Sequence, residues 1–226
     1  RFTLQSAAKL VVLAGALEDL GPAAVFATVG TEPSGESFAS IAQLDSRGPR
    51  PANPLINAGG IALCGIVPGT LEERIAWVEG WARRLCGTEL HISSRVYASE
   101  RRTGDRNRSI AYLLRSSGIL KDRVDDTLDV YFSLCSLEAT VVQAAHLGCV
   151  LACGGVAPGG QRVLSEETAS RVVALMASCG MYDESGTYLM RTGLPAKSGV
   201  SGVIVAVALG RGGVGVSSPR LNARGG

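Results

Sequence analysis

The apolar and polar positions of the chain follow three different patterns. From Ser6 to about Leu20, apolar residues recur at helical spacing on nearly every side, which predicts a buried helix that Gly21-Pro22 ends. Residues 30–60 are rich in glycine, proline, serine and asparagine, so we expect an irregular stretch that runs over the surface. A long helical region and a short region of strands follow.

The middle of the chain predicts a succession of helices. Thr70 is followed three residues later by Glu73, the spacing of a capping box, and Gly87 is placed to end this helix. Four further stretches have helical periodicity, the last of them capped by Ser165: about 104–117, 123–134, 137–152 and 166–178. The region from about 20 to 180 is therefore expected to form a mainly helical lobe.

After Gly186 the pattern changes to short runs of valine and isoleucine separated by glycine. Three of these runs predict antiparallel strands: Thr187–Arg191, Ala196–Leu209 and Gly213–Ser217. We expect an α+β fold in a single domain over residues 1–226, with the sheet part at about 186–218. The helix at 6–20 is expected to lie between the lobe and the sheet.

Composition excludes several classes of protein. The net charge of +2 and the lack of a long basic run argue against nucleic acid as a partner, and no apolar run is long enough to cross a membrane. The six cysteines form no C-x-x-C pair and there are only two histidines, so zinc spacing is absent and no metal is expected. We predict a soluble protein with reduced thiols in the cytoplasm, the alternative being a secreted protein with disulfides.

Lysine is scarce in a chain that is rich in arginine. Of the 22 basic residues only three are lysines, so a retained lysine calls for a chemical reason. A buried lysine can lose its proton near neutral pH and act as a base, whereas an arginine effectively never does. Lys121 has the surroundings of a surface residue, which leaves Lys9 and Lys197 as candidates for chemistry.

Ser6 and Lys9 are three residues apart on the first predicted helix. Residues at this spacing share a face, so the lysine amine can reach the serine hydroxyl and take its proton, which would make the serine a nucleophile. The alternative is a buried helix in which both side chains are only structural. The sequence alone leaves the two interpretations open.

A second motif, Lys197-Ser198-Gly199, lies late in the chain on a predicted strand. In the penicillin-recognising serine enzymes a tripeptide of this type follows Ser-x-x-Lys in the same order and context. That architecture would supply an oxyanion hole from the backbone N–H groups of Ser6 and Val200. No Ser-x-Asn or Tyr-x-Asn is present, so a generic β-lactamase interpretation loses one of its three supports.

Along essentially its whole length the chain resembles the serine-dependent glutaminase family. The matching stretches are Gln5-Ser6-Ala7-Ala8-Lys9, Glu32-Pro33-Ser34-Gly35 with Phe38, Asn53-Pro54-Leu55-Ile56-Asn57-Ala58-Gly59, Ser99-Glu100 with Thr103-Gly104-Asp105-Arg106-Asn107-Arg108, Asp129-Val130-Tyr131-Phe132, Cys179-Gly180-Met181-Tyr182-Asp183 and Gly193-Leu194-Pro195-Ala196-Lys197-Ser198-Gly199-Val200. The resemblance implies a fold like that of β-lactamases and penicillin-binding proteins. It also implies hydrolysis of L-glutamine to L-glutamate and ammonia without a cofactor, by a homo-oligomer that is a dimer or a tetramer.

The resemblance also implies the roles of individual residues. It makes Ser6 the nucleophile, Lys9 its base and Tyr182 a proton-relay partner, while the amides of Ser6 and Val200 are the oxyanion donors. The other positions that match the family's substrate-binding residues are Asn57, Glu100, Asn107 and Tyr131. A free amino acid carries an ammonium that needs a carboxylate and a carboxylate that needs donors, so these residue types suit the substrate.

Each of these substrate-binding residues has a structural alternative. Glu100 stands beside Arg101 and Arg102 and is open to interpretation as half of a solvated ion pair. In the same way Tyr131 is open to interpretation as a core residue and Asn57 as a turn residue. Family members also carry a segment ahead of Ser-x-x-Lys, which contributes strands and a substrate-contacting tyrosine, and a C-terminal helix that packs on the sheet. The resemblance implies that this sequence lacks both ends.

The leading hypothesis is therefore an amidohydrolase that acts on glutamine through a glutamyl-serine acyl-enzyme. The first alternative is a penicillin-interacting serine hydrolase, either a β-lactamase or a D-Ala-D-Ala peptidase. The second is a fragment that binds an amino acid without turning it over.

Overall fold

A computed structural model of the chain describes residues 1–35, 50–121 and 123–218. Phe38 and most of the predicted irregular stretch lie outside the described residues. In chain order the helices are η1 (Gln5–Ala8, a 3₁₀ turn), α1 (Lys9–Asp19), α2 (Gly21–Thr28), α4 (Asn57–Ile66), α5 (Leu71–Cys86), α6 (Ser94–Thr103), α7 (Asp105–Ser116), α8 (Val124–Cys135), α9 (Val141–Ala152), α10 (Glu166–Cys179), η2 (Tyr182–Glu184, also 3₁₀) and α11 (Ser185–Thr192). The strands are β1 (Phe2–Thr3), β2 (His91–Ile92), β3 (Leu137–Ala139), β4 (Ala196–Ser198), β5 (Val203–Ala208) and β6 (Gly212–Ser217).

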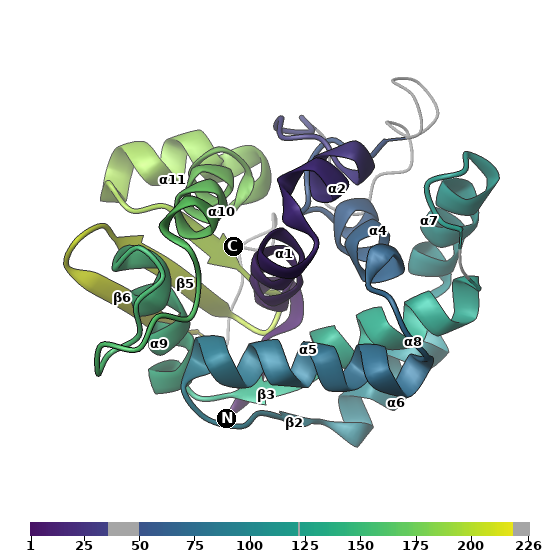
Figure 1. Cartoon of the computed structure of the whole chain (residues 1–226), viewed down its shortest axis with the longest axis horizontal. Helices are drawn as coiled ribbons and strands as arrows, with labels where there is room; N and C mark the ends of the chain where they lie inside the picture. The colour runs from purple at the N-terminus through teal and green to yellow at the C-terminus, as the bar shows by residue number, and fades with distance from the viewer. Residues whose placement is uncertain (36–49, 122, 219–226) are drawn as a thin grey trace.

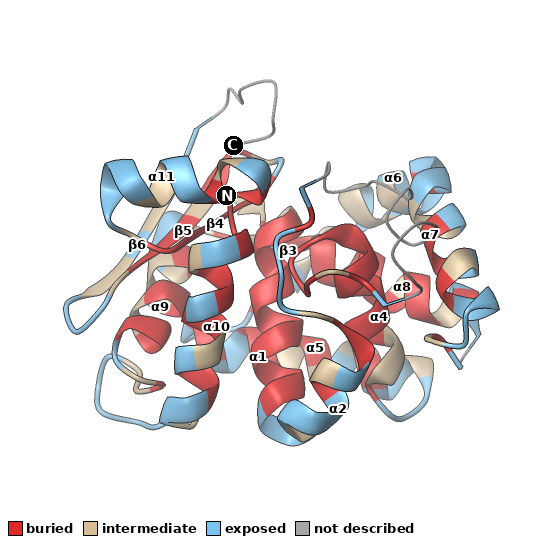
Figure 2. Ribbon diagram, turned by 90° about the horizontal axis from the view of Figure 1, so that it is seen from above, coloured by how far each residue is buried: buried red, intermediate tan, exposed pale blue. Residues whose placement is uncertain are grey.

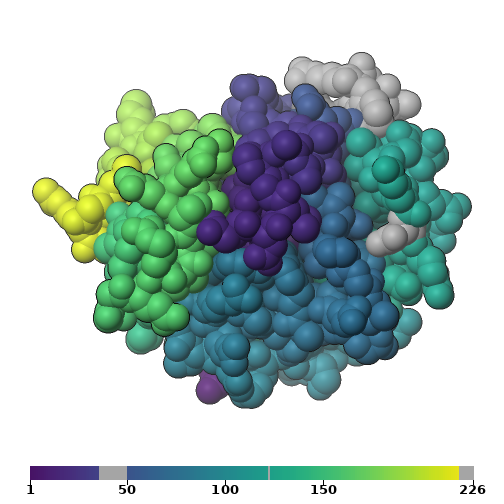
Figure 3. Space-filling model, viewed as in Figure 1, coloured from purple at the N-terminus to yellow at the C-terminus, as the bar shows by residue number. Residues whose placement is uncertain are grey.

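Helix α1 lies in the middle of the molecule. On one side of it are the sheet β4–β5–β6 and helices α9 to α11, on the other are α4 and α6 to α8, and α5 runs beneath it (Figure 1). Every residue from Lys9 to Leu17 is buried, as Figure 2 shows by colour. In the space-filling view the N-terminal residues separate the C-terminal part of the chain from the helical part (Figure 3). Because α1 touches both sides, its apolar surface all round is what joins them.

Two tryptophans of α5 fix the far end of α1. The indole N–H groups of Trp77 and Trp81 both donate to Oδ2 of Asp19, at 2.7 Å and 2.8 Å. The rings pack so tightly on Gly15 that a Cβ there would lie 2.7 Å from Cδ1 of Trp81. The two helices are thus held at short range by both polar and apolar contacts.

The larger sheet is antiparallel throughout, in the order β4–β5–β6. Lys197 of β4 lies opposite Val205 of β5. Helix α9 packs across β5 and β6 at backbone distance, because Gly213 and Gly215 offer no side chain: a Cβ on Gly213 would lie 2.1 Å from the Ala145 carbonyl oxygen. The second sheet, in the order β1–β3–β2, is small and pairs the start of the chain with Leu137–Ala139.

Most of the predicted helices are present, with corrections between residues 20 and 141. Gly21-Pro22 ends α1 as expected and then begins α2, since a proline at the first helical positions has no N–H to satisfy. Residues 57–66 form α4 within the stretch expected to be irregular. The helix predicted from 137 begins only at 141, after a capping box at Thr140 and Gln143, and residues 137–139 are strand β3.

The C-terminal prediction needs two further corrections. The strand predicted at Thr187–Arg191 is wrong, because these residues belong to the amphipathic helix α11, which Gly193 ends at φ 69°. The run Ala196–Leu209 is two strands joined by a turn, in which Gly202 has φ 87°. Helix α6, rich in charged residues, was not predicted at all.

Candidate active site

Ser6 and Lys9 meet at the entry to the central helix. The turn η1 is a 3₁₀ helix, in which residues three apart eclipse each other, so Lys9 stands directly over Ser6. Lys9 Nζ donates a hydrogen bond of 2.7 Å to Oγ of Ser6. The preceding residue, Gln5, has φ 49°, a left-handed conformation that non-glycine residues rarely adopt.

The Lys9 amine is wholly removed from water. Burial disfavours the charged form and lowers the pKa of Lys9 from 10.5 to about 8, against the opposing influence of Cys135, Cys64 and Glu100. A larger fraction of this lysine is therefore neutral near physiological pH than of a lysine in water. A neutral amine at hydrogen-bond distance from a hydroxyl is able to act as its base.

Two asparagines continue the hydrogen-bond chain away from Lys9. Lys9 Nζ also donates to Oδ1 of Asn57 at 3.0 Å, and Nδ2 of Asn57 donates to Oδ1 of Asn107 at 3.0 Å. Asn57 is the first residue of α4 and Asn107 lies on α7, so this series of hydrogen bonds connects α1 to two further helices. Gly60 permits this approach, since a Cβ there would lie 3.0 Å from Cε of Lys9.

Two buried tyrosines flank the same amine and hydroxyl. Tyr182 begins η2 with φ 57°. Burial raises the pKa of Tyr182 to about 12, and a hydrogen bond with Ser6 acts in the opposite direction. The ring centroid of Tyr131, on α8, lies 5.7 Å from Lys9 Nζ, and burial raises the pKa of Tyr131 well above 10. Both phenols are thus neutral and able to donate hydrogen bonds.

Glu100 reaches the site through Gln5. Nε2 of Gln5 donates to Oε1 of Glu100 at 3.2 Å, and both residues line a surface recess together with Ser99 of α6. Of the arginines that follow Glu100, Arg101 pairs with Asp129, its Nε 3.2 Å from Oδ1, and Arg102 lines the same recess as Glu100. A carboxylate at the edge of a recess is suited to hold a ligand ammonium.

The turn between β4 and β5 lies against the residues around Ser6. A Cβ on Gly199 would lie 2.6 Å from the Leu4 carbonyl oxygen and 3.4 Å from the Ala7 nitrogen, so the two backbones are in direct contact. Val200 follows this glycine and is 42% exposed. The position of the turn suits a role that uses the Val200 amide and not its side chain.

All eight residues singled out in the sequence are thus linked to η1 and α1, directly or through one residue. Nothing in the sequence indicated Gln5 as the partner of Glu100. Lys197, already a candidate from the scarcity of lysine and from the Lys197-Ser198-Gly199 motif, contacts the ring of Tyr182. In the part of the chain that the structure describes, no group of three or more His, Cys, Asp or Glu side chains is placed to hold a metal ion.

Comparison with known proteins assigns this constellation to a family. The family model described as Glutaminase matches residues 1–226. The chain belongs to the glutaminase family. A glutaminase of Legionella pneumophila (strain Corby) is 50% identical over 224 residues, which cover 99% of this chain and 72% of that protein. Glutaminase 2 of Clostridium perfringens (strain 13 / Type A) is 40% identical over 229 residues, covering 100% of this chain and 75% of that protein.

Solved structures agree with the family assignment. A probable glutaminase, ybaS, has a TM-score of 0.96 and 39% identity, with 100% of this chain and 74% of that chain covered. A probable glutaminase of Bacillus subtilis has a TM-score of 0.95 and 35% identity, with 99% and 76% covered. The resemblance noted in the sequence and the β-lactamase-like α+β fold are confirmed. Within the described residues, no helix of this glutaminase-family chain has the length and apolar character to cross a membrane.

Proposed function

We propose that this chain hydrolyses the side-chain amide of L-glutamine to give L-glutamate and ammonia through a glutamyl-serine acyl-enzyme, with Ser6 as nucleophile. Membership of the glutaminase family supports the overall reaction. The observation that carries the mechanism is the 2.7 Å hydrogen bond between a wholly buried lysine amine and the serine hydroxyl. No other pair in the described site combines a hydroxyl nucleophile with a base of lowered pKa.

Acylation begins when neutral Lys9 takes the proton of Ser6 Oγ as the oxygen attacks the amide carbon of glutamine. The carbonyl oxygen becomes an oxyanion, which the backbone N–H groups of Ser6 and Val200 stabilise. The C–N bond then breaks, and the nitrogen leaves as ammonia after it receives a proton from Tyr182 or Lys9. The glutamyl group remains on Ser6 as an ester.

Deacylation repeats these steps with water as the nucleophile. The group that gave its proton to the ammonia, Lys9 or Tyr182, accepts a proton from the water as it attacks the ester carbonyl, and Lys9 returns a proton to Ser6 Oγ when the ester bond breaks. L-Glutamate leaves and the starting protonation states are restored. No step requires a metal ion or an organic cofactor.

Recognition of the free amino acid completes the proposal. Glu100 receives the α-ammonium, while Asn57, Asn107 and Tyr131 supply donors to the α-carboxylate. The support for this division is chemical: a carboxylate pairs with an ammonium, whereas amide N–H groups and a phenol donate hydrogen bonds to a carboxylate. The chain as a whole would serve as one catalytic domain of a cytoplasmic homo-oligomer, a dimer or a tetramer.

The test is release of ammonia from L-glutamine by this chain and by its Ser6→Ala variant. Acid quenching during turnover, followed by mass spectrometry of the peptide that carries Ser6, should detect an added glutamyl group in the parent alone. Hydrolysis without any adduct and with Ser6→Ala still active would refute the mechanism. Labelling of Ser6 by a β-lactam, with no ammonia released, would instead favour a penicillin-type hydrolase.

A further inference from the structure

Lys197 is a second buried lysine in the centre of the molecule, and the mechanism above does not use it. It lies in the middle of β4 with none of its side chain exposed to water. The chain has 19 arginines and three lysines, so a lysine at this position, where arginine is the more frequent cation, calls for a specific reason. Unlike Lys9, Lys197 makes no hydrogen bond to Ser6; its amine is bonded to backbone carbonyl oxygens of the described residues.

The surroundings of the Lys197 amine are those of an ammonium. Nζ donates hydrogen bonds to the carbonyl oxygens of Gly180, at 3.0 Å, and Ser198, at 2.7 Å. It also lies 4.0 Å from the centroid of the Tyr182 ring. The nitrogen thus has three acceptors around it, two carbonyl oxygens and the negative face of an aromatic ring. An ammonium group has three N–H donors, one for each of them.

The same contacts hold the short turn that carries Tyr182. Gly180 lies directly on β4, since a Cβ there would lie 1.8 Å from the Ala196 carbonyl oxygen. From the other side, Oγ of Ser185 accepts a hydrogen bond from the Met181 amide at 3.0 Å and donates one to the Tyr182 carbonyl at 2.8 Å. A non-glycine residue in the left-handed region persists only when its surroundings hold it there.

We propose that Lys197 is a positioning residue of the active site: by binding the Gly180 carbonyl and covering the Tyr182 ring with its ammonium, it holds the phenol against Ser6. The inference rests on the proposed function, in which Tyr182 relays protons. The charge on the ring face also favours the negative charge that the phenol oxygen develops when it gives up a proton.

Other groups around the phenol act on it independently of Lys197. Those that face Tyr182 are Ser6, Cys135 and Tyr131, and Lys9 faces Lys197 itself. Burial, and then the charge of Lys9, lower the pKa of Lys197 well below 10.5, whereas the two carbonyl oxygens and the ring face favour its protonated form. A test must therefore separate the path through Tyr182 from a general effect on the site.

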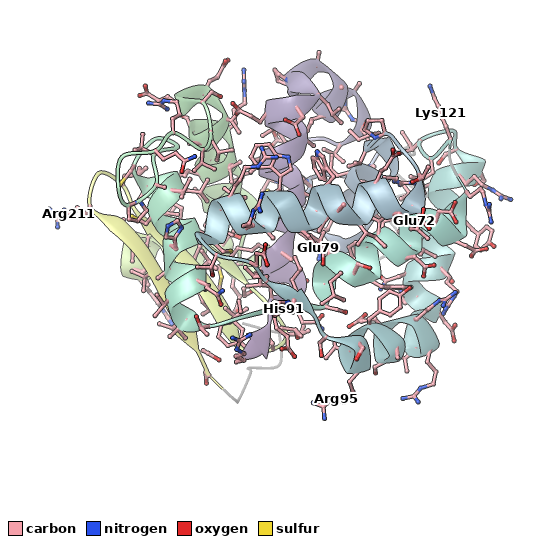
Figure 4. The ribbon with its side chains drawn as sticks, turned by 60° about the horizontal axis from the view of Figure 1, so that its bottom comes forward. Glu72, Glu79, His91, Arg95, Lys121 and Arg211 are labelled. Atoms are coloured by element: carbon pink, nitrogen blue, oxygen red, sulfur yellow. The ribbon has the colours of Figure 1, made fainter. Side chains whose placement is uncertain are left out.

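The experiment is a double-mutant cycle on glutamine hydrolysis. Lys197→Met removes the charge and the hydrogen bonds at nearly constant length. It is made in the parent and in a Tyr182→Phe background. The matched control is Lys121→Met, because Lys121 projects into solvent at the edge of the molecule (Figure 4). Both kcat and KM are measured for each protein, together with thermal unfolding.

In the parent we expect Lys197→Met to lower kcat roughly 100-fold, the scale of a general acid-base contribution, with KM changed by less than about threefold. In the Tyr182→Phe background the same change should lower kcat by less than about threefold, because the phenol through which Lys197 acts is gone. Lys121→Met should leave both constants unchanged. Lys197→Gln, which keeps donors for the carbonyls without charge, should fall between Lys197→Met and the parent.

Two results would overturn the inference and leave the proposed function standing. One is an equal loss of kcat from Lys197→Met in both backgrounds, which would mean that Lys197 acts on the site as a whole. The other is failure of both Lys197→Met and Lys197→Gln to fold, which would make the lysine purely structural. If Tyr182→Phe alone kept kcat within about threefold of the parent, the relay role in the proposed function would be refuted, and the inference with it.

Discussion

Replacing Lys9 by methionine should abolish activity and at the same time make the protein more stable near neutral pH. Methionine is unbranched and close to lysine in length, so it fits the same space without a charge. The Lys9 amine is wholly buried, and no carboxylate of the described residues is bonded to it. Burial of an ionised group without a charged partner opposes folding.

The size of this effect follows from the pKa of Lys9. Burial lowers that pKa from 10.5 to about 8, and this difference corresponds to about 3 kcal/mol of free energy of unfolding. Between these two values the unfolded chain binds more protons than the folded chain, so the stability of the parent rises with pH across this window. Methionine relieves the penalty but removes hydrogen bonds to Ser6 and Asn57, each contributing about 1 kcal/mol.

We therefore expect Lys9→Met to raise the free energy of unfolding by about 1–2 kcal/mol near pH 7. Near pH 10 Lys9 is already neutral in the folded parent, so most of the penalty for burying its charge is gone. The difference in stability should then change sign, and the variant should be less stable than the parent by about 1 kcal/mol. Urea unfolding at both pH values, on parent, Lys9→Met and Lys121→Met, measures the difference. Parent and variants share every other titrating group, so the comparison isolates Lys9.

A variant that is less stable than the parent at both pH values, by the same amount, would refute this reasoning. It would mean that Lys9 is not penalised by burial and that its pKa in the folded protein is close to that of a lysine in water. The argument for Lys9 as a base near neutral pH would then lose its physical support.

The remaining predictions concern turnover. Ser6→Ala should abolish ammonia release with the thermal unfolding midpoint nearly unchanged, since alanine suits a helical turn; activity within tenfold of the parent would remove Ser6 from the nucleophile role. Lys9→Arg should be nearly as inactive as Lys9→Ala, because a guanidinium keeps the charge and cannot act as a base. In the parent, kcat/KM should rise as the pH passes through about 8, because Lys9 then loses its proton and becomes able to act as the base. Glu100→Gln should weaken the use of glutamine by roughly 1.5–3 kcal/mol, the scale of a charge-assisted hydrogen bond, while an activated ester without an α-amino group still acylates Ser6 at close to the parental rate. Equal losses on both substrates would make Glu100 structural.

The sequence was informative where a pattern is local. The capping box at Thr70 and Glu73 and the glycine at 87 fixed both ends of α5. Ser6 and Lys9 were close in space because a single turn of helix separates them. By contrast, periodicity could not distinguish a short amphipathic helix from a strand at Thr187–Arg191, where tertiary packing against α10 decides the outcome.

Contacts between distant segments were beyond the reach of such patterns. Asn57 and Asn107 are 50 residues apart and meet only because α4 and α7 pack together. Only the resemblance to the glutaminase family indicated that both residues belong to one site, because no spacing in the sequence relates them. Gln5 gave no indication of its left-handed backbone or of its bond to Glu100, since glutamine has no preference for that conformation.

The burial of α1 on both sides has a consequence for how the molecule opens. Local fluctuations free the amides of elements that have few apolar contacts, such as α6, which has no buried residue. Helix α1 touches α2, α4, α5 and α10, so its amides can meet solvent only when those contacts separate together. Its backbone hydrogens should therefore be among the last to exchange with deuterium. Ser6 and Lys9 then lie at the start of a helix that opens rarely. The recess beside Glu100, by contrast, is bordered by α6, which opens readily.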